Sequence, residues 1–380
     1  MEWKEVRLGE VADVQTGPFG SQLHKENYVN KGTPIVTVEH LGNKWFTSQN
    51  LPMVSDEDKL RLAKYCSQEG DVIFSRVGSV DRCSYVSKEY SGWLFSGRCL
   101  RVRPRSGINP EYLYYFLTNE GTKQYIRNIA VGATMPSINT KLLNEVPITI
   151  PSLDDQRRIV SILSSLDRKI ELNNKINADL EEMAQAIFKN WFVDFEPFKD
   201  GKFVDSELGM IPEGWKVGTL GDITKNKSAK VKERNDVKVL SPVTTGELVL
   251  SEEYFTKQVF SSSIAKYKIV NKGDFAYNPA RVNIGSLGRN EFDFDGCVSP
   301  VYVVFSVLDG YENYFDLFRN TDFFKDSVAS LAIGGVRQSL SYDDLCSIEV
   351  IIPSENAVEE FNNLYNQMKK TIKANKLENS

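Results

Sequence analysis

Long hydrophobic runs are absent from this 380-residue sequence. No stretch of about 18 consecutive apolar residues occurs, so we predict no membrane span. The chain opens with Met1-Glu-Trp-Lys-Glu, whose charges do not resemble a signal peptide. We therefore expect a cytoplasmic location.

Cysteine and histidine are scarce. The five cysteines are odd in number and contain no C-x-x-C pair, which indicates reduced, structural thiols. Because His24 and His40 are the only histidines, a histidine-based metal site would need carboxylates from elsewhere in the chain. We expect no metal site.

Complete catalytic motifs are also missing. Asn278-Pro-Ala-Arg281 resembles the Asn-Pro-Pro-aromatic motif of amino-methyltransferases, but it lacks the second proline and the aromatic residue. The run from Gly92 to Arg98 has the glycine spacing of a phosphate loop without its Lys-Ser/Thr pair. No carboxylate stands with a Lys or His in a pattern typical of nucleases or hydrolases. The sequence therefore predicts a non-catalytic chain and disfavours a methyltransferase.

The composition is that of a soluble globular protein, with 41% hydrophobic and 26% charged residues. The length favours two domains and a connector. The net charge is −5, yet residues 1–150 hold 18 basic and 16 acidic side chains, so the global charge hides a local surplus. Four arginines are concentrated within eight residues, at Arg98, Arg101, Arg103 and Arg105.

Internal repeats are the strongest signal in the chain. The segment beginning at Trp3 recurs at Trp215, 212 positions later, with a shared Leu-Gly-acid-aliphatic ending. Near the end of each repeat, Ile148-Thr-Ile-Pro-Ser152 recurs as Val350-Ile-Ile-Pro-Ser354 at an offset of 202. The changing offset indicates loops of different length on one scaffold, so we predict two duplicated domains.

Each repeat combines short β-rich runs with one helix. Strand-like segments such as residues 34–38 and 301–305 are separated by Gly and Asn turns. A helix is predicted from Pro110 to Ile126, with a counterpart from Tyr314 to Phe324. We therefore predict an α+β fold for each domain, with a mixed or antiparallel sheet.

Each Pro-Ser pair precedes an amphipathic segment. Alternating spacings of four and three predict a coiled-coil helix over residues 153–191, and a shorter helix from Glu355 to about Leu377 carries a stripe that can pack against it. Two asparagines fall in the seam, where buried amides fix the register; an ordinary core helix is the alternative. The predicted pairing residues are Ile159, Leu163, Leu166, Ile170, Asn173, Asn177, Leu180 and Ile187 with Phe361, Leu364, Met368 and Ile372.

An aromatic cluster follows the central helix and precedes a Gly/Pro-rich linker over residues 199–214. It either closes the joint between the helix and the second domain or docks another subunit, because aromatics are enriched at interface centres. The candidate docking residues are Trp191, Phe192, Phe195 and Phe198.

Polar loops occur in both repeats and suit DNA recognition. Arg can bind the O6 and N7 atoms of guanine, Asn can bind adenine, and Lys or Ser more often holds phosphate. For any one of these residues taken alone, a solvated loop side chain is the favoured interpretation, so the hypothesis depends on the set. The candidates are Arg76, Arg82, Arg98, Arg101, Thr134, Ser137 and Asn139 in the first domain, and Lys257, Arg281, Asn283, Arg289, Arg337 and Ser339 in the second.

The doubled domains, the two Pro-Ser-led helices and the segment Trp191-Phe-Val-Asp-Phe-Glu-Pro-Phe198 with Ile211-Pro-Glu-Gly-Trp215 resemble the specificity subunit of type I restriction-modification enzymes. The resemblance spans the chain. It implies target recognition domains at 1–150 and 199–353, helical spacers at 151–198 and 354–380 that form an antiparallel coiled coil, and pseudo-twofold symmetry.

The same resemblance implies partners. The chain would bind double-stranded DNA, two modification subunits that use S-adenosylmethionine and restriction (motor-nuclease) subunits that use ATP and Mg, with no cofactor of its own. Each domain would read one half of a bipartite, asymmetric site, and the helices would set the spacer. The alternative is a coiled-coil scaffold whose globular domains bind proteins.

Overall fold

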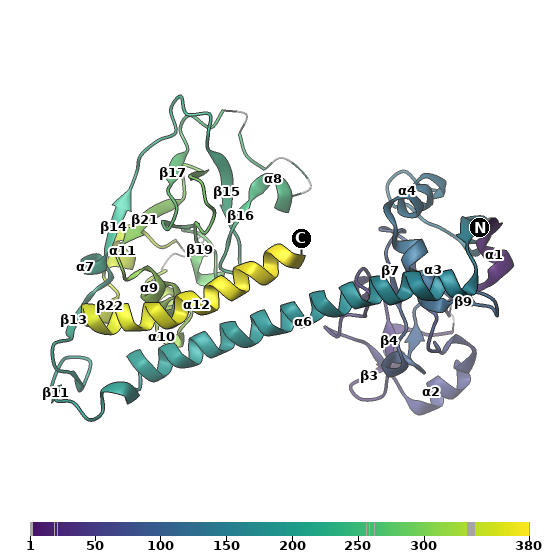
Figure 1. Ribbon diagram of the computed structural model, residues 1–380, viewed down its shortest axis with the longest axis horizontal. Coiled ribbons are helices and arrows are strands. Elements are labelled where there is room, and N and C mark those ends of the chain that lie inside the picture. Colours follow the sequence, from purple (N-terminus) through teal and green to yellow (C-terminus); the bar gives the residue numbers. More distant parts are fainter. Residues whose placement is uncertain are drawn as a thin grey trace. The chain divides into compact units, whose positions relative to one another are not determined.

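The chain forms two compact units in a computed structural model that describes residues 3–379 except Phe19, Ser21, Thr256, Gln258, Ser262 and 333–338. The units are Met1–Ile170 and Glu171–Ser380. The long helix α6 (Leu153–Phe192) begins in the first unit and ends in the second (Figure 1).

The first unit contains a strand pair and two four-stranded sheets. The pair joins β1 (Lys4–Arg7) to β10 (Pro147–Ile150) in antiparallel register. One sheet is antiparallel, with the order β2 (Ala12–Thr16), β9 (Cys99–Pro104), β6 (Val72–Ser75) and β7 (Cys83–Tyr85). The other is mixed, since β4 and β8 run parallel, with the order β3 (Tyr28–Val29), β5 (Met53–Val54), β4 (Thr33–Val36) and β8 (Leu94–Phe95).

Short helices connect these strands. Asn109 caps α3 by accepting hydrogen bonds from the backbone N–H groups of Glu111 and Tyr112, and Asn119 caps α4. The helix predicted from Pro110 to Ile126 is therefore two helices, because the Asn119 cap begins a new one. The helices are α1 (Leu8–Val11), α2 (Asp56–Arg61), α3 (Pro110–Thr118), α4 (Glu120–Ile129) and α5 (Thr140–Asn144), with 3-10 turns η1 (Lys25–Asn27), η2 (Val38–His40), η3 (Ala63–Tyr65) and η4 (Lys88–Tyr90).

The second unit repeats this plan. The strand pair is β13 (Lys216–Thr219) with β22 (Glu349–Ile352). The antiparallel sheet has the order β14 (Thr224–Lys227), β21 (Val303–Val307), β18 (Phe275–Tyr277) and β19 (Leu287–Arg289). The mixed sheet has the order β16 (Leu248–Leu250), β15 (Lys238–Pro242), β20 (Gly296–Val298) and β17 (Lys268–Val270), with β15 parallel to β20.

The remaining elements of the second unit are a small hairpin and a set of helices and 3-10 turns. A small hairpin, β11 (Phe203–Val204) with β12 (Ile211–Pro212), lies in the linker. The helices are α7 (Leu220–Ile223), α8 (Ser251–Tyr254), α9 (Glu312–Phe318), α10 (Asp322–Leu331), α11 (Tyr342–Cys346) and α12 (Glu355–Asn379), with 3-10 turns η5 (Glu196–Phe198) and η6 (Val282–Ile284). The predicted α+β duplication is confirmed.

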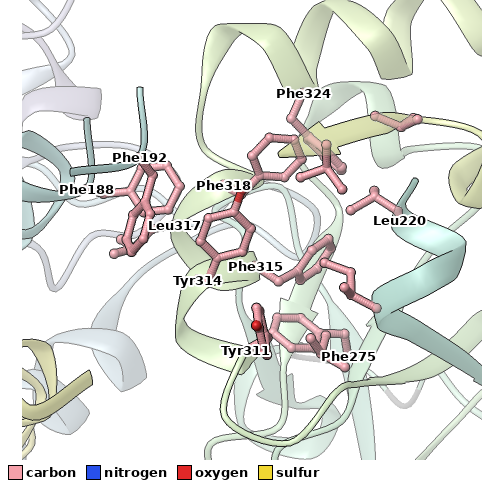
Figure 2. Packing of buried hydrophobic residues seen from close by; sticks show 14 of the residues in the cluster. Phe188, Phe192, Leu220, Phe275, Tyr311, Tyr314, Phe315, Leu317, Phe318 and Phe324 are labelled. Carbon is pink, nitrogen blue, oxygen red and sulfur yellow. The ribbon is translucent and has the colours of Figure 1, made fainter. Parts of the chain in front are cut away.

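Aromatic side chains dominate the core of the second unit. Figure 2 shows Phe188 and Phe192 of α6 beside Tyr314 of α9, with ring centroids 5.4 and 5.1 Å from the Tyr314 ring. Phe192 also packs on Phe361 of α12 at 5.0 Å. Burying rings of this size supplies much of the driving force that holds α6 and α12 to the domain.

The part of α6 in the second unit pairs with α12 in antiparallel orientation. Asn173 is buried and donates to the Asn379 side chain at 3.0 Å, while Asn375 donates to the Asn177 side chain at 2.8 Å. The predicted asparagine seam is thus confirmed.

Other predicted pairing residues lie elsewhere. Ile159 packs against the core of the first unit, and Leu166 and Ile170 are 53% and 38% exposed. On α12, Leu364 is 38% exposed and Tyr365 is buried in its place. The prediction placed Leu364 in the stripe, three residues after Phe361, but Tyr365, four residues after Phe361, lies on the buried face instead.

The aromatic cluster after α6 packs within the second unit. Phe192 is 4% exposed, and the Trp191, Phe195 and Phe198 side chains are partly buried against the same core. The Phe198 ring lies 5.0 Å from that of Trp215. The first of the two interpretations therefore holds for Phe192, whose burial leaves it no surface for another subunit.

Candidate nucleic-acid interface

Three loops of the first unit meet at one end of its antiparallel sheet. The loop after β6 is joined to the turn before β9 by the bond from Arg76 N to Arg98 O, 2.8 Å long. It is joined to residues 131–138 by bonds from Gly78 N to Pro136 O at 2.8 Å and from Ile138 N to Arg76 O at 2.9 Å. We call residues 76–82, 96–98 and 131–137 the first loop cluster.

Three predicted arginines lie in the first loop cluster and differ in their contacts. The Arg76 guanidinium donates to Gly97 O at 3.3 Å, and Arg82 donates to Leu41 O. The Arg98 side chain is exposed, and among the described residues it has no hydrogen-bond or ion-pair partner. An arginine held by its backbone with a free guanidinium is suited to bind guanine or phosphate.

Arg101 is a correction to the sequence-based prediction. Its side chain lies in β9, and the residue is only 7% exposed. Burial lowers the pKa of Arg101, and its Nε lies 4.0 Å from the buried Asp71 carboxylate, which makes a two-bond contact with Arg103 at 2.7 Å. The hydrogen bond to Asp71 raises the pKa of Arg103. These arginines support the sheet, and Arg101 cannot reach a DNA base.

The other polar candidates of the first unit divide in the same way. Asn139 caps α5 by accepting a hydrogen bond from Leu142 N at 2.9 Å, so its amide is structural. The Ser137 hydroxyl donates to Val131 O at 3.1 Å and closes the third loop. Thr134 is exposed in that loop.

The second unit forms corresponding loops. Leu340 N donates to Pro279 O at 3.1 Å, as Ile138 N does to Arg76 O, and Asn278 N donates to Ser286 O at 3.1 Å. We call residues 278–286 and 299–302 the second loop cluster. Its position matching Arg76 is therefore Pro279.

The predicted residues of the second unit are less concentrated. Arg281 and Asn283 are exposed in the second loop cluster, while Lys257 and Ser339 are exposed elsewhere. Arg289 is structural, because it donates to Asn313 Oδ1 at 2.8 Å and lies over the Phe275 ring. Arg337 lies outside the described residues.

A partly buried lysine in the first unit had no signal in the sequence. The Lys44 ammonium lies 2.8 Å from Glu111, 3.0 Å from Asp167 of α6 and 2.7 Å from the Tyr115 hydroxyl. Its backbone carbonyl accepts a bond from Tyr85 N at 2.8 Å. Lys44 thus fastens the 41–44 segment to α3 and α6 through partners far away in sequence.

The cysteines are free thiols, as predicted. Burial raises the pKa of both Cys83 and Cys99 to about 12, so these thiols stay protonated and unreactive at neutral pH. Within the described part of the chain, no helix is long and apolar enough to cross a membrane.

The comparisons with known proteins agree with the fold. Residues 1–182 match the family described as type I restriction modification DNA specificity domain. The MjaIX specificity subunit of Methanocaldococcus jannaschii is 29% identical over 377 residues, which cover 96% of this chain and 86% of that protein. The HindI specificity subunit of Haemophilus influenzae is 30% identical over 203 residues, covering 52% of this chain and 42% of that one.

A solved structure shows the same fold. The S subunit of a type I restriction-modification system from M. genitalium superposes with a TM-score of 0.55 at 15% identity, covering 100% of this chain and 94% of the other. Residues 1–182 therefore match a type I restriction-modification DNA specificity domain, and the whole chain is similar to type I restriction enzyme specificity subunits, which are the non-catalytic components of their complexes.

Proposed function

We propose that each unit reads one half of a bipartite, asymmetric DNA target. The observation that carries the proposal is the strand order of the antiparallel sheet, which is the same in both units and presents loop clusters of different chemistry. Arg76 and Arg98 of the first loop cluster correspond to Pro279 and Val301 of the second, so the two units cannot read the same bases.

The helices and their partners complete this proposal. The 40 residues of α6 span about 60 Å, and we propose that the helices set the length of the unread spacer between the half-sites. The exposed Leu166 and Ile170 of α6 support docking of two modification subunits on this helix. S-adenosylmethionine, ATP and Mg would then be bound by the modification and restriction subunits.

A domain exchange tests the modular part. Residues 1–150 are replaced by those of another specificity subunit, and the methylated sites of the host are mapped before and after. One half-site should change while the other half-site and the spacer length stay. A change in both half-sites would contradict the assignment of one half-site to each unit.

A binding assay separates DNA reading from a protein-binding scaffold. The chain with its modification subunits should shift a duplex that carries the mapped site, and the shift should weaken as salt rises. A scaffold that binds only proteins would leave the duplex unshifted at every salt concentration.

A further inference from the structure

A lysine-rich ribbon lies beside the second loop cluster. Residues 229–232 pair antiparallel with residues 265–269, through bonds from Val231 N to Tyr267 O at 2.9 Å and from Ile269 N to Ala229 O at 2.8 Å. The second strand of this ribbon continues into β17, which Figure 1 shows on the side of the second unit away from α12.

The ribbon has an apolar face and a basic face. Val231 and Tyr267 are 1% and 8% exposed and belong to a small core with Cys297. Lys230 and Lys268 stand directly opposite each other, so their side chains share the other face. Lys266 is exposed in the turn that leads into β17, which the bond from Tyr267 N to Ile264 O closes at 2.8 Å.

A fourth lysine extends the basic face at its end. Lys232 is exposed and has a φ of 55°, a left-handed conformation that is costly for a residue with a side chain. Its backbone N–H donates to Ala265 O at 2.9 Å, which keeps it in the ribbon.

The ribbon lysines differ from the other cations around them. Lys272 and Lys373 both bind Asp293, and Arg234 binds Asp236 and Asp295. In the described part of the chain, no acidic side chain forms an ion pair with Lys230, Lys232 or Lys266. Like charges placed opposite each other on a strand pair destabilise it, so the fold itself does not call for this arrangement.

The position of the ribbon links it to the second loop cluster. It follows β14, which runs in the same direction as β18 because both are antiparallel to β21. The ribbon and residues 278–286 therefore leave the sheet at the same end. In addition, the Lys268 ammonium donates to Tyr302 O at 2.6 Å and fastens the ribbon to the loop before β21.

We infer that the lysines of this ribbon, Lys230 and Lys268 on its basic face with Lys232 and Lys266 at its turn end, bind the phosphates of the DNA backbone beside the second loop cluster. The inference rests on the proposed function, because it assumes that the second unit reads DNA. Lysine is a point charge that suits phosphate and carries no base preference. The ribbon would thus add affinity and orientation, while the loops supply sequence preference.

The test uses the full chain assembled with its modification subunits. A variant with Lys230→Gln, Lys232→Gln and Lys266→Gln keeps Lys268 and its bond to Tyr302. Affinity for a duplex with the mapped target and for an unrelated duplex is measured by fluorescence anisotropy between 50 and 200 mM salt. A control with Lys202→Gln, Lys216→Gln and Lys370→Gln removes the same charge from exposed positions outside the ribbon.

We expect the ribbon variant to bind both duplexes more weakly by the same factor. Each phosphate contact contributes about 0.9 to the slope of log affinity against log salt concentration. If each of the three substituted lysines binds one phosphate, the wild type should lose roughly 40-fold more affinity than the variant between 50 and 200 mM salt. The control should keep the wild-type slope. The melting temperature of the ribbon variant should equal or exceed that of the wild type, because like charges have been removed.

If the wild type prefers its target duplex, two results would overturn the inference about the lysines while leaving the proposed function intact. One is an unchanged salt slope in the ribbon variant, and the other is a loss confined to one half-site sequence, which would make the lysines base readers. A wild type that prefers no duplex would instead remove the proposed function, and the inference with it.

Discussion

The two units share a scaffold and differ in the charges placed on it. In both units, an aspartate directly precedes the second strand of the antiparallel sheet in chain order, β6 or β18. Its carboxylate accepts a hydrogen bond from the backbone N–H three residues earlier. Asp71 accepts from Gln68 at 2.8 Å, and Asp274 accepts from Asn271 at 2.9 Å. The cation that meets this aspartate comes from β9 in the first unit, as Arg103, and from β14 in the second, as Lys227. Both units therefore keep a buried aspartate at the same position, but the strand that supplies its cationic partner differs between them.

The same contrast extends to the surface. The first loop cluster offers arginines, whereas the second has Pro279 and the 71% exposed Val301 at the matching positions and a lysine ribbon next to it. Arginine suits base reading and lysine suits phosphate. The first unit is accordingly expected to contribute more of the sequence preference, and the second more of the salt-dependent affinity.

Removing the buried aspartate should have the largest effect on stability, and the size of the loss should differ between the two units. Asp71→Asn leaves Arg101 and Arg103 without their anion, and we expect the free energy of unfolding to fall by about 3 to 5 kcal/mol. Burial raises the pKa of Asp274 despite its bond to Lys227, so its charge is a net cost to the fold, and Asp274→Asn should cost less than about 1 kcal/mol. Urea unfolding of both variants measures the difference, and equal losses would contradict it.

The second largest difference is expected in the contacts that hold α6 to the first unit and α12 to the second. Lys44→Met leaves Glu111 and Asp167 facing each other without a cation, and we expect a loss of about 2 kcal/mol. Position 313, which matches 111, is an asparagine bonded to Asn362 and Asn366 of α12 at 3.0 Å. Asn313→Leu should therefore cost about 1 kcal/mol. Native-state hydrogen exchange of α3 and α9 gives both values, and a larger loss in α9 would count against the comparison.

Two substitutions at matching positions of the loop clusters should have a smaller effect, on DNA discrimination and not on stability. Arg98→Ala should reduce discrimination at one base pair of one half-site by about 1 to 3 kcal/mol without changing stability. Val301→Ala, at the matching position, should leave the other half-site unchanged. Binding to a panel of single-base target variants tests both. Uniform weakening across the panel for Arg98→Ala would show a phosphate contact instead.

The smallest effect concerns an exposed ion pair of α12. Bonds from Lys272 and Lys373 lower the pKa of Asp293 to about 2. Because the folded pKa lies below the ordinary 3.8, this carboxylate stabilises the fold above about pH 4 and loses that contribution as the pH falls towards 2. Lys373→Met should raise the pKa of Asp293 in an NMR titration. An unchanged value would mean that Lys272 alone accounts for the shift.

The sequence predicted the duplication, the fold class and the asparagine seam because each leaves a local or repeated pattern. It did not distinguish Arg98 from Arg101, which lie three residues apart, because the burial of Arg101 depends on Asp71 thirty residues earlier. Lys44 was missed for the same reason, since its partners come from two later helices. The lysine ribbon is visible only as a Lys-x-Lys pattern on each strand, and the pairing of Lys230 with Lys268 gives it a common face.

The seam between α6 and α12 limits which residues can occupy it. Asn173 and Asn177 are the repeat counterparts of Asn375 and Asn379, at the offset of 202, and each bonds with the counterpart of the other. In an exact repeat, the residue at position 173 would therefore meet a copy of the residue at position 177, so the two positions must be compatible with each other. Asparagine at both positions satisfies this condition because an amide carries both a donor and an acceptor, whereas the same charge at both positions would be repeated at 375 and 379 and would be repelled.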